Sequence, residues 1–327
     1  MGRYEKEMTQ KEGFAKNGFP APWRSIVLVA VLFLVGVIAF WGKGFASPGS
    51  LQSMVRRAAS EGGILALGMT FVLLTGQIDL SGGAIVALSG VLGAVLQPEG
   101  GFIVLAAAIC IGAICGFING MLVTGLHIPS WLATLGSMYI FRNIAQLISR
   151  QRTISVTSLT WQRLGSMQFL GIHIAIWIFV ALTLLCMFVG AYTGFGRSLH
   201  TCNRQPSGKE TSPGRDRVIV SAFTCSGMLA GLAGVLLAGR LNTVSYTTGT
   251  GWEISALAMC VLGGVGFCGG KGSFLGVFFG ALAVSLITTL CNFSGFLGVE
   301  WQMIILTVVV LCAAALDFGF PRKKHRE

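Results

Sequence analysis

The sequence predicts an all-α polytopic membrane protein with about ten transmembrane helices, some of them interrupted. Of its 327 residues, 54% are hydrophobic and only 11% are charged, and the mean hydropathy is +0.76. A soluble domain carries about 25% charged residues, so too few charges remain here to cover a water-exposed surface. The charges are also segregated, which leaves uncharged runs as long as the ~20 apolar residues that cross a bilayer. These features exclude a soluble enzyme, and the lack of alternation excludes an outer-membrane barrel.

Ten segments are predicted to cross the membrane, six before a polar stretch at 197–217 and four after it. The longest uncharged run, 100–141, divides into two crossings at Pro129, because proline interrupts a helix. The predicted spans are residues 25–41, 62–78, 80–98, 102–123, 131–148, 170–193, 218–239, 254–268, 274–291 and 301–318.

The basic residues predict that both ends and the central polar stretch are cytoplasmic, since loops rich in Lys and Arg stay on that side. Five precede the first span, five lie within 197–217 and four lie within 322–326. We therefore expect a cytoplasmic tail at 1–24, a transmembrane domain at 25–318 with its cytoplasmic loop near 197–217, and a basic cytoplasmic tail at 319–327. The three arginines of 149–167 are the largest exception, so they either face a partner or indicate a different span count nearby.

The segment 76–83, Gly-Gln-Ile-Asp-Leu-Ser-Gly-Gly, contains the only carboxylate between Glu61 and Glu99. A charge at membrane depth is costly and usually faces a bundle interior or an aqueous cavity. Glycines allow a helix to break there, and Ser81 can cap the helix that restarts. One interpretation is an interrupted helix beside a translocation path, and an equally supported one is a plain cytoplasmic turn. The candidate residues are Gly76, Gln77, Asp79, Ser81 and Gly82.

A second glycine-rich break is predicted at 262–273, Leu-Gly-Gly-Val-Gly-Phe-Cys-Gly-Gly-Lys-Gly-Ser. It superficially resembles a phosphate-binding loop, but that motif requires Ser or Thr after the lysine, and Gly272 follows Lys271. The chain therefore carries no nucleotide-binding loop of its own. The candidate residues of this break are Gly263, Gly264, Gly269 and Gly270, with Glu253 in the preceding span.

The two breaks align at an offset of 188 residues, which pairs Gly76 with Gly264, Leu74 with Leu262 and Gly82 with Gly270. Paired interrupted helices within an internal repeat are typical of transporters. Glycine-rich apolar sequence also matches itself by chance, so a duplication is only slightly favoured.

Small residues recur at helical spacing in three further segments. Such faces let helices approach closely in lipid, and we expect packing within one subunit more than a dimer interface. The three sets are Gly112, Gly116 and Gly120; Gly227, Gly231 and Gly234; and Gly272, Gly276 and Gly280.

No catalytic, metal or cofactor site is predicted. The nine cysteines lack the two-residue spacing of zinc and redox motifs, and the four histidines are far apart in the sequence. Eight cysteines lie in apolar runs, where they are expected to act as small packing residues.

Three motifs in order resemble the inner-membrane permease subunits of sugar ABC importers, the ribose, xylose, arabinose and autoinducer-2 group. The resemblance covers about Gly44 to Asp317. The family pattern G-M-T…G-G-I-D-L-S-V-G corresponds to residues 68–83, and S-G-x-x-A-x-L-A-G corresponds to 226–234. The third, G-T-G-x-E…L-G-G…G-G-x-G-S, corresponds to 249–273.

The resemblance implies ten spans in the bacterial inner membrane, two identical or different permease subunits, cytoplasmic ATP-binding subunits and a periplasmic solute-binding protein. It implies no enzymatic activity, because ATP is hydrolysed on a separate subunit, and no nucleic-acid partner is expected. Asp79 and Glu253 are expected to hold the two breaks in shape, and their glycines to supply flexible backbone. The central loop is expected to contact the ATPase through Asn203, Arg204, Gly208, Gly214 and Arg215.

The chain departs from the family pattern at two places. Gln77 replaces the second glycine of the first motif, and Gly82 replaces its valine. The central loop also lacks the family's small-residue pattern, and several of its residues oppose a continuous helix: Pro206, Gly208, Pro213 and Gly214.

The solute is expected to be a pentose, a hexose or a related polyol. One alternative is the branched-chain amino-acid or nucleoside branch of the same superfamily. Another is an ion-coupled secondary transporter, in which Asp79 would be the proton or sodium site.

Overall fold

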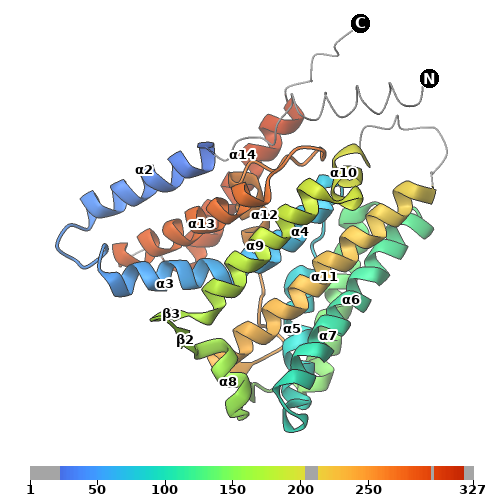
Figure 1. Ribbon diagram of the computed structural model, residues 1–327, viewed down its shortest axis with the longest axis horizontal. Coiled ribbons are helices and arrows are strands. Elements are labelled where there is room, and N and C mark those ends of the chain that lie inside the picture. The colour runs from blue at the N-terminus through green and yellow to red at the C-terminus, as the bar shows by residue number, and fades with distance from the viewer. Residues whose placement is uncertain (1–22, 203–212, 296–297, 320–327) are drawn as a thin grey trace, which may run out of the picture.

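The computed structural model describes residues 23–202, 213–295 and 298–319, and its longer helices form one bundle (Figure 1). The predicted all-α class is confirmed. The helices are α2 (Trp23–Ala39), α3 (Pro48–Ala58), α4 (Ile64–Leu74), α5 (Gly82–Val95), α6 (Gly101–Gly125), α7 (Ser130–Ser149), α8 (Leu159–Ser166), α9 (Ile174–Tyr192), α10 (Gly194–Thr201), α11 (Pro213–Leu241), α12 (Trp252–Leu262), α13 (Phe274–Ser294) and α14 (Val299–Gly319).

Short irregular and extended elements connect these helices. A π-helical turn at Ala59–Gly63 joins α3 to α4, and a 3-10 turn at Gln97–Glu99 follows α5. Two small antiparallel ladders pair β1 (Ile154–Ser155) with β4 (Thr243–Val244) and β2 (Gln168–Phe169) with β3 (Ile172–His173). In Figure 1, α8, β2 and β3 lie at the lower end of the bundle, and α10 and the start of α11 lie at the upper end.

In the part of the chain that the structure describes, four helices are long and apolar enough to cross a bilayer by themselves: Gly101–Gly125, Ile174–Tyr192, Gly214–Leu241 and Phe274–Ser294. The predicted span at 62–78 begins earlier than expected, because α3 starts at Pro48 and continues through the π-helical turn into α4. Ser47 caps this start by accepting a hydrogen bond from the Ser50 N–H at 3.3 Å. The charges of Arg56 and Arg57 concealed this extension in the sequence.

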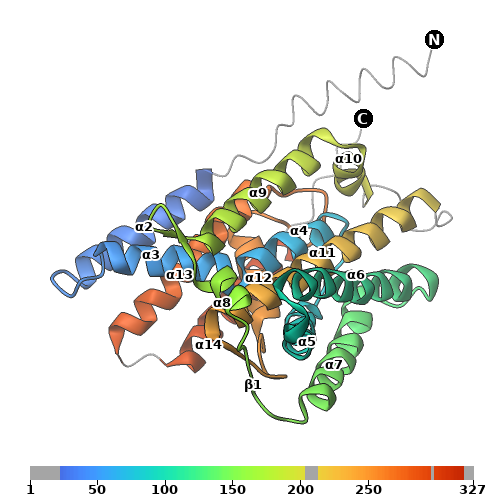
Figure 2. The same cartoon turned by 60° about the horizontal axis from the view of Figure 1, so that its bottom comes forward.

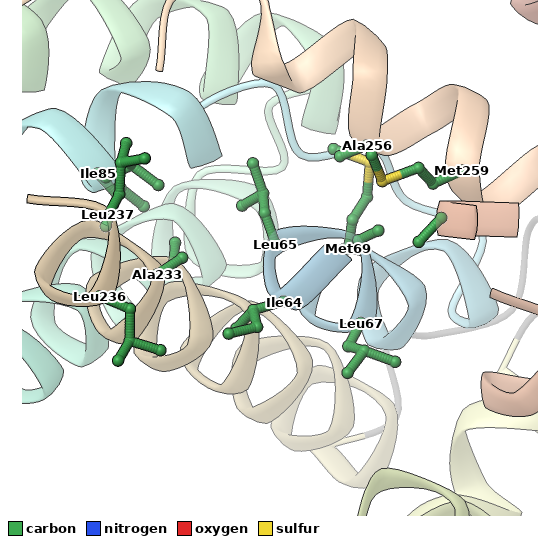
Figure 3. Close-up of a cluster of buried hydrophobic side chains, with 14 of the residues drawn as sticks. Ile64, Leu65, Leu67, Met69, Ile85, Ala233, Leu236, Leu237, Ala256 and Met259 are labelled. Atoms are coloured by element: carbon green, nitrogen blue, oxygen red, sulfur yellow. The ribbon is translucent and has the colours of Figure 1, made fainter. Parts of the chain in front are cut away.

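Helix α4 lies at the centre of the bundle, and side chains around its whole circumference are buried. Figure 3 shows Ile64, Leu65, Leu67 and Met69 of α4 between side chains of neighbouring helices. These neighbours are Ile85 of α5, Ala233, Leu236 and Leu237 of α11, and Ala256 and Met259 of α12. A helix that is apolar all round is typical of a protein core or a membrane span, and α4 is enclosed by the other helices of this bundle.

The outer helices expose large apolar side chains. On α6, Phe102 is 82% exposed, and on α7, Leu147 is 77% exposed. Figure 2 shows α6 and α7 side by side at the edge of the bundle. Exposed apolar faces of this extent are unfavourable in water and match the hydrocarbon of a bilayer.

The small residues face each other inside the bundle, which confirms the prediction of packing within one subunit. On α6, Gly112 lies against the backbone of Gly227 on α11, and Gly116 lies against the backbone of Phe223. On α13, Gly276 and Gly280 lie against the backbone of Gly263 and Met259. A Cβ at any of these glycines would overlap a carbonyl oxygen, so glycine is what permits these helices to touch.

The segment 150–173 forms a packed cap rather than another crossing, because its helix α8 has only eight residues. Trp161 of α8 is fully buried, and its indole N–H donates to the Val235 carbonyl of α11 at 2.8 Å. Gly93 and Gly239 leave the room that this indole occupies. The three arginines that did not fit the predicted cytoplasmic placement of basic residues are exposed: Arg150, Arg152 and Arg163.

Replacing Trp161 with alanine is expected to destabilise the protein by about 3–5 kcal/mol, because it opens a large cavity and leaves the Val235 carbonyl without its donor. The measurement is thermal unfolding of the detergent-extracted protein. Trp177, which is 42% exposed, provides the matched control. Equal unfolding temperatures for Trp161→Ala and Trp177→Ala would contradict the anchoring role of the indole.

Candidate functional site

The first predicted break is the extended segment 75–81 between α4 and α5. Helix α4 ends on Gly76, whose φ of +79° is a left-handed conformation that glycine adopts without strain. The Gly76 N–H donates to the Leu73 carbonyl at 2.9 Å, and the Gln77 N–H donates to the Val72 carbonyl at 3.3 Å. This paired pattern terminates the helix and directs the chain into the bundle.

Asp79 is 1% exposed and joins the break to neighbouring helices. Its Oδ1 accepts hydrogen bonds from the Ser81 N–H at 2.9 Å and the Ser81 hydroxyl at 2.7 Å. Its Oδ2 accepts from the Ser226 hydroxyl of α11 at 3.0 Å. The Asn119 side-chain amide of α6 donates in turn to the Ser81 hydroxyl oxygen at 2.7 Å. The carboxylate therefore connects the break, α6 and α11 through one buried network.

The extended backbone of this break is satisfied by side chains of α7. The Ile78 N–H donates to the Ser130 hydroxyl oxygen, and the Leu80 N–H donates to the Thr134 hydroxyl oxygen, both at 3.1 Å. Irregular backbone at membrane depth requires such partners. The structure shows a non-helical segment enclosed by α6, α7 and α11. The interrupted helix beside a translocation path and the cytoplasmic turn both stay predictions.

The second break, 263–273, repeats the helix ending of the first. Gly264 has a φ of +82°, its N–H donates to the Val261 carbonyl at 2.8 Å, and the Val265 N–H donates to the Cys260 carbonyl at 2.9 Å. Each of these bonds lies 188 residues after its counterpart in the first break. The predicted offset thus relates two helix ends with the same hydrogen-bond pattern.

The offset does not continue beyond the helix ends. Gly82 begins α5, whereas Gly270, its predicted counterpart, lies within the longer second break, and α13 starts only at Phe274. Gly269 and Gly270 both have a φ of +72°. The pairing of Gly82 with Gly270 is therefore wrong, because the second break contains additional residues.

The two breaks contact each other. The Gly270 N–H donates to the Leu74 carbonyl, the last of α4, at 2.9 Å. Gly269 lies so close to Gly76 that an added Cβ would be 2.6 Å from the Gly76 nitrogen. Two segments that are far apart in the sequence thus form one glycine-rich junction.

Glu253 lies in the first turn of α12, away from the second break that it was expected to shape. Its Oε1 accepts a hydrogen bond from the Gly251 N–H at 3.2 Å, and its Oε2 is buried beside Gly83 at the start of α5 without a hydrogen bond. Arg142 of α7 donates to the carbonyls of Tyr246 and Thr248, at 2.8 and 3.2 Å, and so anchors the loop that precedes α12. Glu253 therefore lies between the N-terminal ends of α5 and α12.

Replacing Glu253 with alanine is expected to lower solute uptake severalfold without loss of membrane insertion. An acidic side chain at a helix N-terminus stabilises it by about 0.5–2 kcal/mol, and Glu253 faces the N-terminal ends of two helices. Uptake into cells and the amount of protein in the membrane fraction are measured together. Glu300, an exposed acid in the first turn of α14, is the matched control. Normal uptake by Glu253→Ala would refute this role.

The predicted ATPase-contact residues are only partly described. Asn203, Arg204 and Gly208 lie outside the described residues, and Gly214 and Arg215 lie in the first turn of α11. Pro213 begins this helix instead of interrupting it, because the first turn of a helix does not need a proline N–H.

Several side chains that form hydrogen bonds with the two breaks or with the loop before α12 were not predicted from the sequence. Asn119 and Thr134 were visible only as polar residues inside apolar runs, a signal that they share with ordinary helix-to-helix contacts. Arg142 lies within the predicted span 131–148, and no role was predicted for it. Nothing in the sequence distinguished Ser130. Ser226 was the first residue of the motif at 226–234, but the motif did not connect it with the first break.

Comparison with known proteins identifies the family. Residues 54–314 match the family described as the permease component of branched-chain amino acid transport systems. The chain belongs to this permease family. No solved structure shows significant similarity to it.

Curated relatives of this permease extend over most of its length. It is 31% identical over 96% of its length to the fructose import permease protein of Rhizobium meliloti, of which it covers 89%. It is 29% identical to the ribose import permease protein of Escherichia coli K12, over 89% of the chain and 92% of that protein. It is 34% identical to the autoinducer 2 import system permease protein of Escherichia coli O157:H7, over 78% and 75%. The chain is thus a multi-pass membrane permease, as its sequence predicted.

Proposed function

We propose that the chain is the permease subunit of an ATP-driven importer that moves a sugar or polyol delivered by a periplasmic binding protein. The observation that carries this proposal is the full-length similarity to import permeases named for fructose, ribose and autoinducer 2. The same similarity favours a sugar over an amino acid. The enclosed junction of the two breaks supports it, because interrupted helices in transporters occur where backbone lines a solute route.

In this proposal the chain crosses the bacterial inner membrane ten times, with both ends and the central loop in the cytoplasm. Two permease subunits surround the path, and separate cytoplasmic subunits hydrolyse ATP. Helix α10 and the start of α11 border the central loop at one end of the bundle (Figure 1), and the exposed Arg197 of α10 adds basic charge there. ATP binding to the separate subunits would shift the permease between conformations, because the ATP-bound subunits contact those conformations differently.

The test is reconstitution of the permease in proteoliposomes with an ATP-binding subunit and a periplasmic binding protein of sugar importers from the same genome. Labelled ribose, fructose and leucine are supplied with the binding protein, and ATP is supplied to the ATPase. The expected result is ATP-dependent uptake of ribose or fructose, and no ATP hydrolysis by the permease alone.

Two outcomes would contradict the proposal. Uptake of leucine alone would place the chain in the amino-acid branch. Uptake that continues without the ATPase but stops when an ionophore dissipates the ion gradient would indicate an ion-coupled secondary transporter.

A further inference from the structure

Helix α10 is a short helix folded tightly against the end of α9. The Thr193 hydroxyl oxygen caps it by accepting a hydrogen bond from the Gly196 N–H at 3.1 Å. Gly196 lies against the carbonyls of Val189 and Gly190, where no side chain would fit. Gly196, Leu199 and His200 are buried on one face of α10, and Arg197 is exposed. The helix is thus held in place on its inner face and open on its outer face.

The first contact between α10 and the breaks is made by His200. Its Nδ1 lies 3.2 Å from the Gly270 carbonyl oxygen of the second break. Since a carbonyl oxygen only accepts, Nδ1 carries the proton and donates. The Gly270 N–H donates to the Leu74 carbonyl of α4. Gly270 is therefore held by α10 on one side and by the end of α4 on the other.

The second contact is aromatic and independent of the first. The ring of Phe195 on α10 stacks on Phe71 of α4, with centroids 6.0 Å apart and an interplanar angle of 22°. Phe71 contacts Phe274, the first residue of α13, with centroids 4.7 Å apart. Phe71 and Phe274 are 4% and 2% exposed. These rings connect α10 to the helix before the first break and to the helix after the second.

We propose that α10 is the lever that transmits movement of the central loop to both breaks at once, with His200 and Phe195 as its positioning residues. This inference rests on the proposed function and assigns roles within it to residues that neither the motifs nor the family match single out. Coupling between distant sites can be carried by contiguous packed side chains and hydrogen bonds. Helix α10 makes one contact of each type, to Phe71 of α4 and to Gly270 of the second break. Movement of α10 displaces Gly270, and Gly270 lies against the end of α4.

The test measures solute imported per ATP hydrolysed in the reconstituted complex with its binding protein and labelled ribose or fructose. His200→Leu removes the donor and is expected to lower this ratio about fivefold, the equivalent of one net hydrogen bond. His200→Asn places an amide N–H near the position of Nδ1 and is expected to retain most of the ratio. If His200 served only to stabilise the fold, its replacement would lower the unfolding temperature together with total activity. The amount of solute imported per ATP hydrolysed would then stay unchanged.

Matched controls separate the two contacts from general disturbance of α10. Ser198→Ala removes a hydroxyl whose bond to the Gly194 carbonyl stays within α10, and it is expected to leave the ratio unchanged. Phe195→Ala is expected to lower the ratio, whereas Phe188→Ala, at a 56% exposed position on α9, is not.

The outcomes distinguish this inference from the proposed function. A wild-type complex that imports solute with ATP, together with an unchanged ratio in His200→Leu and Phe195→Ala, would overturn the lever alone. Equal loss in His200→Asn and His200→Leu would overturn the role of the Nδ1 hydrogen bond. A wild-type complex without ATP-driven uptake would overturn the proposed function and the lever with it.

Discussion

Replacement of Asp79 by alanine is expected to abolish most uptake, lowering it by more than about tenfold, while the protein still inserts into the membrane. The substitution leaves the Ser81 N–H, the Ser81 hydroxyl and the Ser226 hydroxyl without their acceptor in a site that is 1% exposed. Each unsatisfied buried donor costs about 1–3 kcal/mol. If the native conformation of the break is destabilised by only about 1.4 kcal/mol, the equilibrium ratio of native to altered conformation falls tenfold. The measurement is uptake normalised to permease in the membrane fraction.

Variants of the partners test whether the effect arises from the hydrogen bonds themselves. Asp79→Asn keeps one acceptor oxygen for Ser81 and is expected to fall between wild type and Asp79→Ala. Ser226→Ala removes one donor, and Ser221→Ala, exposed on the same helix α11, is its control. A double-mutant cycle of Asp79 and Ser226 is expected to give a coupling energy of about 1 kcal/mol. Additive effects of the two substitutions would show that this bond does not hold α11 to the break.

Replacement of Gly112 by alanine is expected to destabilise the protein by about 3 kcal/mol or more, a large part of the 5–15 kcal/mol that a typical protein possesses. The new Cβ would overlap the Gly227 carbonyl oxygen, which is backbone and has no other rotamer. Helices α6 and α11 would have to separate along their shared face. The expected result is a lower yield of folded protein and a lower unfolding temperature in detergent.

The matched control is Gly136→Ala in helix α7. Nothing lies within 4 Å of a Cβ added at Gly136, so alanine there gains about 0.5–1 kcal/mol of helix propensity. The same chemical substitution is thus expected to have opposite signs at the two positions. An equal effect at Gly112 and Gly136 would contradict the close packing of α6 and α11.

Much of the fold was predictable, because the composition of a segment indicates whether its helix is surrounded by lipid or by water. Uncharged runs predicted membrane segments, and Gly76 and Gly264 predicted the two helix ends, where a positive φ excludes most other residues. The start of α3 at Pro48 was missed, because Arg56 and Arg57 resembled a loop between spans. The charges of a helix end that extends beyond the hydrocarbon resemble those of a loop. Only the backbone hydrogen bonds in the structure distinguish such a helix end from a loop.

The candidate site was predictable in part. Asp79 was identified from the cost of a charge in an apolar segment, but its partner Ser226 lies 147 residues away in the sequence. Glu253 was expected to shape the second break, yet it lies between the N-terminal ends of α12 and α5. From a carboxylate in an apolar segment we can infer that it needs a hydrogen-bond donor. The sequence does not tell us which donor lies next to it in the folded protein.

By itself, the sequence predicted the membrane class, the glycine-rich segments 76–83 and 262–273 as candidate breaks and the glycine faces, because each depends on residues close together in the chain. The tertiary structure decided that Gly269 lies against Gly76, that Asp79 is bound by Ser226 and that α10 contacts both α4 and Gly270 of the second break. The physical reason is range: backbone conformation and hydropathy are local, whereas van der Waals contacts act only at short distance and hydrogen bonds require both a short distance and a favourable angle. They form only once distant helices have packed together.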